Sequence, residues 1–137
     1  MSALKLLAED AEDLGVVAAA LQDATTKIGD ISYEPAGRRL TVGFNRFRWE
    51  AKKKERVRSA LQFGGVLSVK ARNLRQGAKD AVLDLLDIAF EPGESPGGAL
   101  ILRFAGDGDL RCEVECIDAA LADVSQPWPA RKVPDHS

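Results

Sequence analysis

The chain has 137 residues, of which 45% are hydrophobic and 29% are charged, a composition typical of one ordinary folded domain with a single core. No apolar run approaches the roughly 20 residues that a membrane-spanning helix needs, and the start lacks a signal peptide's basic and apolar regions, so we expect a cytoplasmic protein with no membrane partner. The formal net charge of −2 conceals an uneven distribution, because residues 38–79 carry a balance of +11 and the rest of the chain −13.

A helix is the first element that the sequence predicts. Asp10 is a suitable N-cap, and the apolar residues after it recur at spacings of three and four through Leu14 and Val17. Gly15 and the β-branched pair that follows it disfavour a helix, so a strand within residues 14–22 stays open as an alternative.

Alternating apolar and polar residues from residue 27 onward predict strands, beginning with a hairpin over residues 31–44. The apolar parity then changes across Asn45–Arg46, which a strand accommodates only with a bulge or a bend. Because Phe47 and Trp49 share a parity, we expect both aromatic side chains to be buried on one face.

The second half of the chain continues the strand pattern. Residues 50–58 are polar, and we expect them to be solvated. Further strands are predicted at residues 61–71, bent at Gly64–Gly65, and at residues 82–90, 100–104 and 110–116. Residues 117–124 have a helical composition, and a proline-rich tail from about residue 125 is expected to be peripheral.

Together these elements predict one α+β domain over residues 1–137. We expect about six antiparallel strands in a strongly curved sheet or a partly open barrel, with one N-terminal helix and a short C-terminal helix.

Three patterns that could indicate catalysis or metal binding have simpler explanations. Residues 93–97 have the letters of a nucleophile elbow, but a strand follows them, and the only histidine is His136 near the C-terminus. The carboxylates of residues 107–115 lie in a turn and on the polar face of a strand, where acids are expected for solubility. Cys112 and Cys116 lie about 13 Å apart along one strand, too far for a disulfide. We therefore expect no catalytic residue, no metal site and no cofactor.

A basic segment is the one candidate binding site. Its cations are Arg46, Arg48, Lys52, Lys53, Lys54, Arg56 and Arg58. Aromatic residues interleave with them, as in single-strand nucleic-acid binders, where bases stack on rings and cations contact phosphates. The alternative is that these cations pair with the acidic remainder of the same domain.

Short motifs spread over the chain are Glu12-Asp-Leu14, Leu21-Gln-Asp-Ala24, Gly29-Asp30, Phe44-Asn-Arg-Phe-Arg-Trp-Glu50, Phe90-Glu-Pro-Gly93 and Phe104-Ala-Gly-Asp-Gly-Asp109. As a set they resemble a proteobacterial family catalogued as domain of unknown function 2948, over about residues 4 to 129. The resemblance implies a bacterial, cytoplasmic, single-domain protein and assigns no catalytic residue.

The leading hypothesis from the sequence is a small non-enzymatic binding or interaction domain. The second is a nucleic-acid or polyanion-binding module that uses residues 46–58, and a small enzyme built from carboxylates ranks last. The sequence indicates neither the partner's identity, protein or polyanion, nor the oligomeric state.

Overall fold

The structure is a computed structural model that describes residues 3–75 and 77–130. Its elements in chain order are β1 (Lys5–Ala8), α1 (Ala11–Ala20), β2 (Thr25–Lys27), the 3-10 turn η1 (Ile28–Asp30), β3 (Ile31–Glu34), β4 (Arg39–Phe47), β5 (Glu55–Phe63), β6 (Val66–Arg72), β7 (Val82–Pro92), β8 (Gly98–Phe104), β9 (Gly108–Val114), β10 (Ala119–Asp123) and β11 (Trp128–Pro129).

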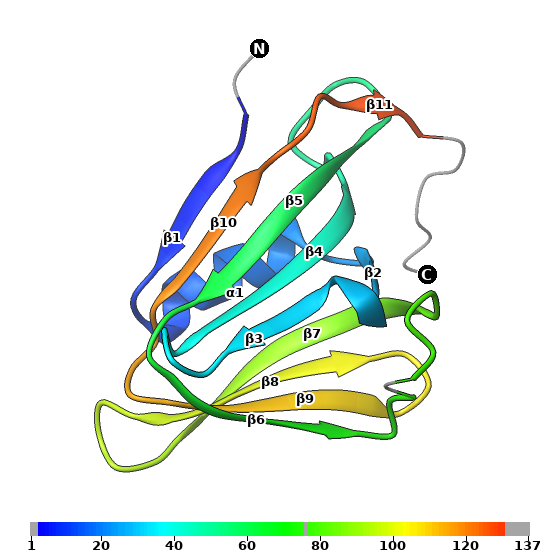
Figure 1. Cartoon of the computed structure of the whole chain (residues 1–137). Coiled ribbons are helices and arrows are strands. Elements are labelled where there is room, and N and C mark those ends of the chain that lie inside the picture. Colours follow the sequence, from blue (N-terminus) through cyan, green and yellow to red (C-terminus); the bar gives the residue numbers. More distant parts are fainter. Residues whose placement is uncertain (1–2, 76, 131–137) are drawn as a thin grey trace.

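The described strands form one sheet of 11 strands, in the order β1-β10-β5-β4-β2-β7-β8-β9-β6, with β3 beside β4 and β11 beside β5. Figure 1 shows that this sheet bends strongly, so that β1, β10, β5 and β4 lie in one layer and β7, β8, β9 and β6 in another, with α1 behind the first layer. The sheet is open and does not close into a barrel. A curved antiparallel sheet with an N-terminal helix is therefore confirmed, whereas the expected number of strands, about six, is wrong.

The helix α1 forms where the sequence predicts it, and the alternative of a strand is wrong. The side chain of Asp10 caps it by accepting a hydrogen bond of 2.8 Å from the N–H of Asp13. Leu14 and Val17 are buried in the core, while Val16 is 53% exposed. Burial of the face that carries Leu14 and Val17 outweighs the low helix propensity of Gly15.

The predicted C-terminal helix is wrong, because residues 119–123 form the strand β10. This strand lies between β5 and β1, where Leu121 pairs with Leu61 on one side and with Leu6 on the other. The alanines of the segment favour a helix locally, but backbone pairing on both sides and full burial of Leu121 outweigh that preference.

The hairpin of β3 and β4 is confirmed, with Ile31 opposite Val42 and Glu34 opposite Arg39. The prediction that Trp49 is buried, however, is wrong. The side chain of Phe47 is buried, with 6% exposed, but Trp49 is 37% exposed. The reason is that β4 ends at Phe47, so strand alternation no longer determines which way Trp49 points. The indole instead packs edge-on against Phe47 at 4.7 Å between ring centroids and donates a hydrogen bond to the carbonyl of Gln22.

The segment expected to be solvated is only partly so. Lys52, Lys53 and Lys54 are exposed, but β5 begins at Glu55 and Val57 is buried. The alternation of β5 thus starts earlier than the apolar pattern suggests, because Glu55 and Arg58 have charged partners inside the domain.

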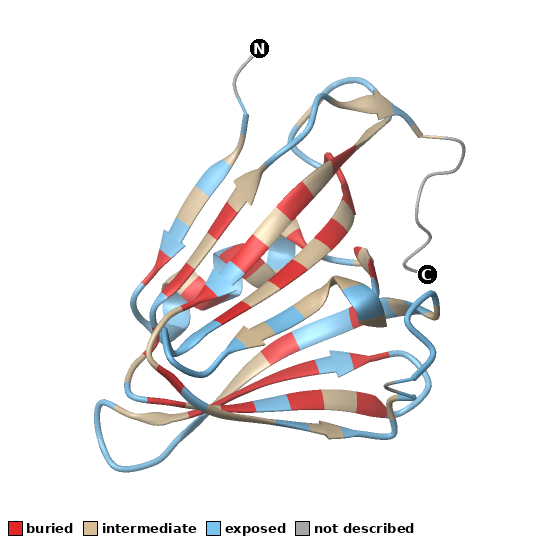
Figure 2. Ribbon diagram, viewed as in Figure 1, coloured by how far each residue is buried: buried red, intermediate tan, exposed pale blue. Residues whose placement is uncertain are grey.

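The core lies inside the bent sheet and combines α1 with strands of both layers. Figure 2 shows buried residues recurring along β4, β5, β8 and β9, whereas β6 is mostly half-buried or exposed. In β6 only Val66 is buried, and a bulge between Val66 and Ser68 leaves Leu67 51% exposed. Gly65, at a φ of +64°, makes the turn into this strand.

Candidate functional site

The predicted basic site is divided by the structure into paired arginines and an exposed lysine loop. Alternation continues past Phe44 and places Arg46 on the inner face of β4, where its side chain is fully buried. Its guanidinium makes two forked contacts, to Asp123 at 3.0 Å and to Glu50 at 2.8 and 2.9 Å. Ser59 completes the group with a hydrogen bond of 2.7 Å to Asp123. Such forked pairing is the strongest geometry available to a buried guanidinium.

Hydrogen bonding controls the ionisation of this buried cluster. Burial acts to raise the pKa of Asp123, but hydrogen bonds from Arg46, Ser59 and the N–H of Leu4 outweigh it and hold that pKa below its usual value. The hydrogen bond from Arg46 likewise lowers the pKa of Glu50. Burial acts to lower the pKa of Arg46, yet its two carboxylate partners raise it. The cluster is therefore a fully charged structural network.

Two further arginines of the predicted site are also engaged within the domain. Arg48, with a side chain 6% exposed, contacts Glu55 at 2.6 Å. Arg58 contacts Asp30 at 2.9 Å, and its guanidinium lies over Gly43, where a side chain would leave it no room. The structure therefore does not bring the seven predicted cations together on one surface.

The remaining four cations of the segment are Lys52, Lys53, Lys54 and Arg56. The lysines are exposed in the loop between β4 and β5, and Arg56 is half-buried beside β11. Among the residues that the structure describes, none of the four has an ion pair with an acid.

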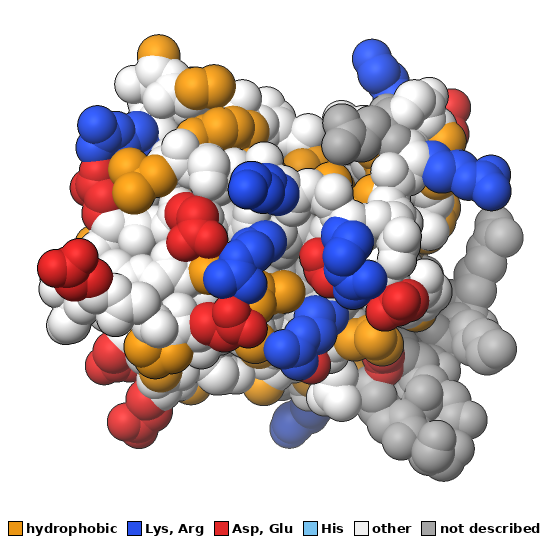
Figure 3. All heavy atoms as spheres, turned by 90° about the horizontal axis from the view of Figure 1, so that it is seen from below, with side chains coloured by type: hydrophobic (Ala, Val, Ile, Leu, Met, Phe, Trp, Pro, Cys, Tyr) orange, Lys and Arg blue, Asp and Glu red, His pale blue; other side chains and the backbone are white. Residues whose placement is uncertain are grey.

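The opposite charges of the two parts of the sequence meet in the folded domain. Arg38 pairs with Glu115, and Arg72 contacts Asp109 at 2.6 Å, each bond joining the basic block to an acid far along the chain. Figure 3, seen from below, shows basic and acidic side chains interspersed on that face. Arginine thus also engages Asp109 and Glu115, two of the carboxylates weighed as a cation site.

The cysteines do not form a site with these groups. Cys112 is fully buried, and burial raises the pKa of its thiol to about 12. Cys116 is half-buried and is not bonded to Cys112. His136 lies outside the described residues.

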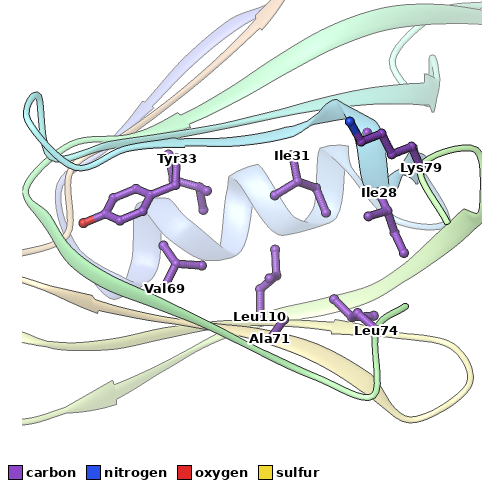
Figure 4. Close-up of a pocket in the computed structure, with 10 residues that line it drawn as sticks. Ile28, Ile31, Tyr33, Val69, Ala71, Leu74, Lys79 and Leu110 are labelled. Atoms are coloured by element: carbon purple, nitrogen blue, oxygen red, sulfur yellow. The ribbon is translucent and has the colours of Figure 1, made fainter. Parts of the chain in front are cut away.

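A different feature, which we call the β3–β6 slot, is a mostly apolar pocket between two strands of the sheet. It has a volume of about 440 Å³. It is lined by Ile28, Gly29, Ile31, Tyr33, Leu40, Val69, Ala71, Leu74, Lys79 and Leu110. Figure 4 shows Ile31 and Tyr33 on one side of the opening, facing Val69 and Ala71 on the other.

The slot exists because two strands face each other without pairing. Within the described residues, β3 pairs only with β4, and β6 pairs only with β9. Each strand therefore presents an unpaired backbone edge. The fully buried Leu40 and nearly buried Leu110 form the deeper part of its lining, while the lining residues of β3 and β6 are half-buried.

Hydrogen bonds close the slot at both ends. At one end the hydroxyl of Tyr33 donates to the carbonyl of Val66 at 2.9 Å. At the other end the N–H of Gly29 donates to the carbonyl of Lys79 at 2.9 Å. A Cβ at position 29 would lie 3.1 Å from that carbonyl oxygen, so glycine permits this close approach.

The chemistry of the lining suits binding. Its side chains are apolar except for the hydroxyl of Tyr33 and the ammonium of Lys79. The hydroxyl is engaged by Val66, and no described acid forms an ion pair with Lys79. The lining contains no carboxylate, histidine or cysteine among its described residues.

Sequence reasoning missed this site because the slot residues look like ordinary strand residues. Ile31 and Tyr33, and likewise Val69 and Ala71, alternate with polar residues as any core-facing set would. Only the missing strand pairing between β3 and β6 shows that these faces stay half-buried. The close approach at Gly29 leaves no signal in a single sequence.

Comparison with known proteins identifies the family alone. No curated protein and no solved structure matches the chain. In the part of the chain that the structure describes, no helix is long and apolar enough to cross a membrane. A family model described as "Protein of unknown function (DUF2948)" matches residues 4–136, nearly the whole chain, and the chain therefore belongs to this family.

Proposed function

We propose that this chain is a small non-enzymatic binding domain whose ligand occupies the β3–β6 slot. The observation that carries the proposal is a pocket of about 440 Å³ whose apolar side chains the sheet leaves uncovered. This volume lies within the roughly 300–1,000 Å³ typical of small-molecule sites, which are mostly apolar with a few polar groups. Covering the half-buried side chains would add hydrophobic stabilisation that the free domain lacks.

A compact ligand fits the slot better than a strand from a partner protein. A partner strand that paired with both β3 and β6 would have to run along the unpaired edges of these two strands and continue past the ends of the slot. The Tyr33–Val66 bond blocks one end of that path, and the Gly29–Lys79 bond blocks the other. The unpaired edge of β3 is also only four residues long. The closure of both ends therefore favours a small molecule.

Binding of an uncharged apolar fluorophore tests the proposal. N-phenyl-1-naphthylamine should fluoresce more strongly with the wild-type protein, because the slot excludes water. Ala71→Trp should weaken this binding about tenfold or more by filling the slot. Lys70→Trp, which adds the same ring at the exposed neighbouring position of β6, should leave it unchanged.

Circular dichroism and thermal unfolding of both variants show whether each remains folded. No binding by the wild type, or equal binding by a folded Ala71→Trp variant, would overturn the proposal.

The alternative function is binding of a polyanion at the loop of residues 48–54 and the adjoining Arg56. The observation in its favour is that Lys52, Lys53, Lys54 and Arg56 have no acidic ion-pair partner among the described residues. Burial and pairing remove Arg46 and Arg48 from such a surface. This leaves a short cationic loop in place of a seven-residue strip, so we rank this function second.

A further inference from the structure

We infer that the ligand of the β3–β6 slot is an anionic amphiphile, with its apolar chain in the slot and its charged head group at Lys79. The inference rests on the proposed function and adds the chemical class of the ligand. Its basis is the position and surroundings of Lys79, the one cation among the described residues of the lining.

Lys79 is held at the boundary between the apolar slot and solvent. Its backbone is fixed there by the hydrogen bond from Gly29, while its side chain is exposed. Figure 4 shows its side chain leaving the slot beside η1, with the nitrogen on the other side of Ile28 from Leu74. A cation in that place stabilises an anionic group at the end of a bound chain.

A second, polar hollow adjoins the slot at this end. It shares Gly29 and Lys79 with the slot, and Lys27, Asp30, Asn45, Arg58 and Asp80 also line it. Arg58 and Asp30 neutralise each other at 2.9 Å. Among the described residues of this lining, Lys27 and Lys79 then stand against one remaining acid, Asp80, which leaves an excess of positive charge.

The two hollows differ in character. One is apolar and lies between strands, and the other is polar and cationic, and they meet at Gly29 and Lys79. The backbone bond between Gly29 and Lys79 separates them, so a bound apolar chain stays in the slot while its head group at the opening is attracted by the charges of Lys79 and Lys27. An uncharged apolar ligand would gain nothing from these charges. A cationic amphiphile would place its head group beside Lys27 and Lys79, which repel it.

The experiment compares ligands with one chain and different head groups. Laurate, dodecyl phosphate, dodecanol and dodecyltrimethylammonium, each below its micelle concentration, compete with N-phenyl-1-naphthylamine for the wild-type protein. We expect laurate and dodecyl phosphate to displace the fluorophore about three- to tenfold more effectively than dodecanol, and the cation to be weakest. The order of the two anions identifies the head group as carboxylate or phosphate. The preference should decline as salt screens the charges.

Lys79→Met keeps the length and apolar stem of the side chain and removes the charge. This variant should still bind the fluorophore but should lose the preference for anions. Lys70→Met, with its exposed lysine on the outer face of β6, should retain both.

The possible failures are distinguishable. Equal displacement by laurate and dodecanol, or an anion preference that survives in Lys79→Met, overturns this inference and leaves the binding site intact. Absence of fluorophore binding overturns the proposed function itself.

Discussion

The two ends of β4 show opposite departures from an ordinary core. At one end Arg46 lies on the inner face of the strand, fully buried and bound by Asp123 and Glu50. At the other end Leu40 contributes to the wall of a slot whose apolar side chains are only half-covered. The buried arginines Arg46 and Arg48 pair with acids of the same domain. The apolar side chains of the slot, by contrast, are not fully covered by other parts of the described chain. Paired charges thus mark structure here, and half-covered apolar surface marks the proposed binding site.

The largest expected effect comes from breaking the buried pair. Asp123→Ala leaves the guanidinium of Arg46 buried with one partner fewer, and should lower the free energy of unfolding by about 3–5 kcal/mol. Urea denaturation measures this change. Asp87→Ala, which removes a half-exposed partner of Arg103 at 3.5 Å, is the control and should change the free energy by less than about 1 kcal/mol. Equal losses in the two variants would show that the buried cluster has no special structural role.

Acid should weaken the same end of the molecule. Folding lowers the pKa of both Asp123 and Glu50, so their stabilising contribution is complete above the unfolded values of about 4 and is lost as pH falls below them. Unfolding free energies measured from neutral pH downward should therefore drop below about pH 4. Glu50→Gln should make that decline shallower. A wild-type curve with no decline in this range would contradict the proposed ionic network.

A smaller effect is expected at the slot. Tyr33→Phe removes the hydrogen bond to Val66 that closes one end, and should lower the free energy of unfolding by about 1 kcal/mol. Because the slot lining is otherwise unchanged, the variant should still bind the apolar fluorophore. Chemical denaturation and fluorescence titration test the two parts of this prediction. A loss of binding without a loss of stability would mean that the hydroxyl contacts the ligand.

The smallest effect is expected at the lysine loop. Replacing Lys52, Lys53 and Lys54 together by alanine should change stability by less than about 0.5 kcal/mol, because all three are exposed. We also expect the wild type to bind heparin and single-stranded DNA no more than weakly, even at low salt.

Tight wild-type binding would favour the alternative function. Its log affinity should then fall linearly with log salt, at a slope of about −0.7 per phosphate contact on single strands, and the triple variant should flatten that slope by about 2.

Local physical chemistry made several elements predictable from the sequence. Asp10 ahead of an apolar period of three to four predicts α1, and the alternation that ends at Phe44 predicts the β3–β4 hairpin. The turn at Gly106 and Asp107 is likewise local, since both residues adopt a positive φ there. Each of these signals depends on neighbours within a few residues.

Contacts between distant segments decided the rest. Arg46 is hydrophilic on any sequence scale, and its burial depends on Glu50 nearby in the chain and on Asp123, which the pairing of β10 with β5 brings beside it. The same pairing makes residues 119–123 a strand against their local helix propensity.

The chain alone determined the helix, the hairpins and the presence of a basic block. The tertiary structure decided which cations are buried and where the sheet stays open. The reason is that ion pairs and strand pairs join residues far apart in the chain, as Asp123 and Arg46 are. The open part of the sheet likewise follows from the tertiary structure, because β3 and β6 do not pair with each other in the described residues.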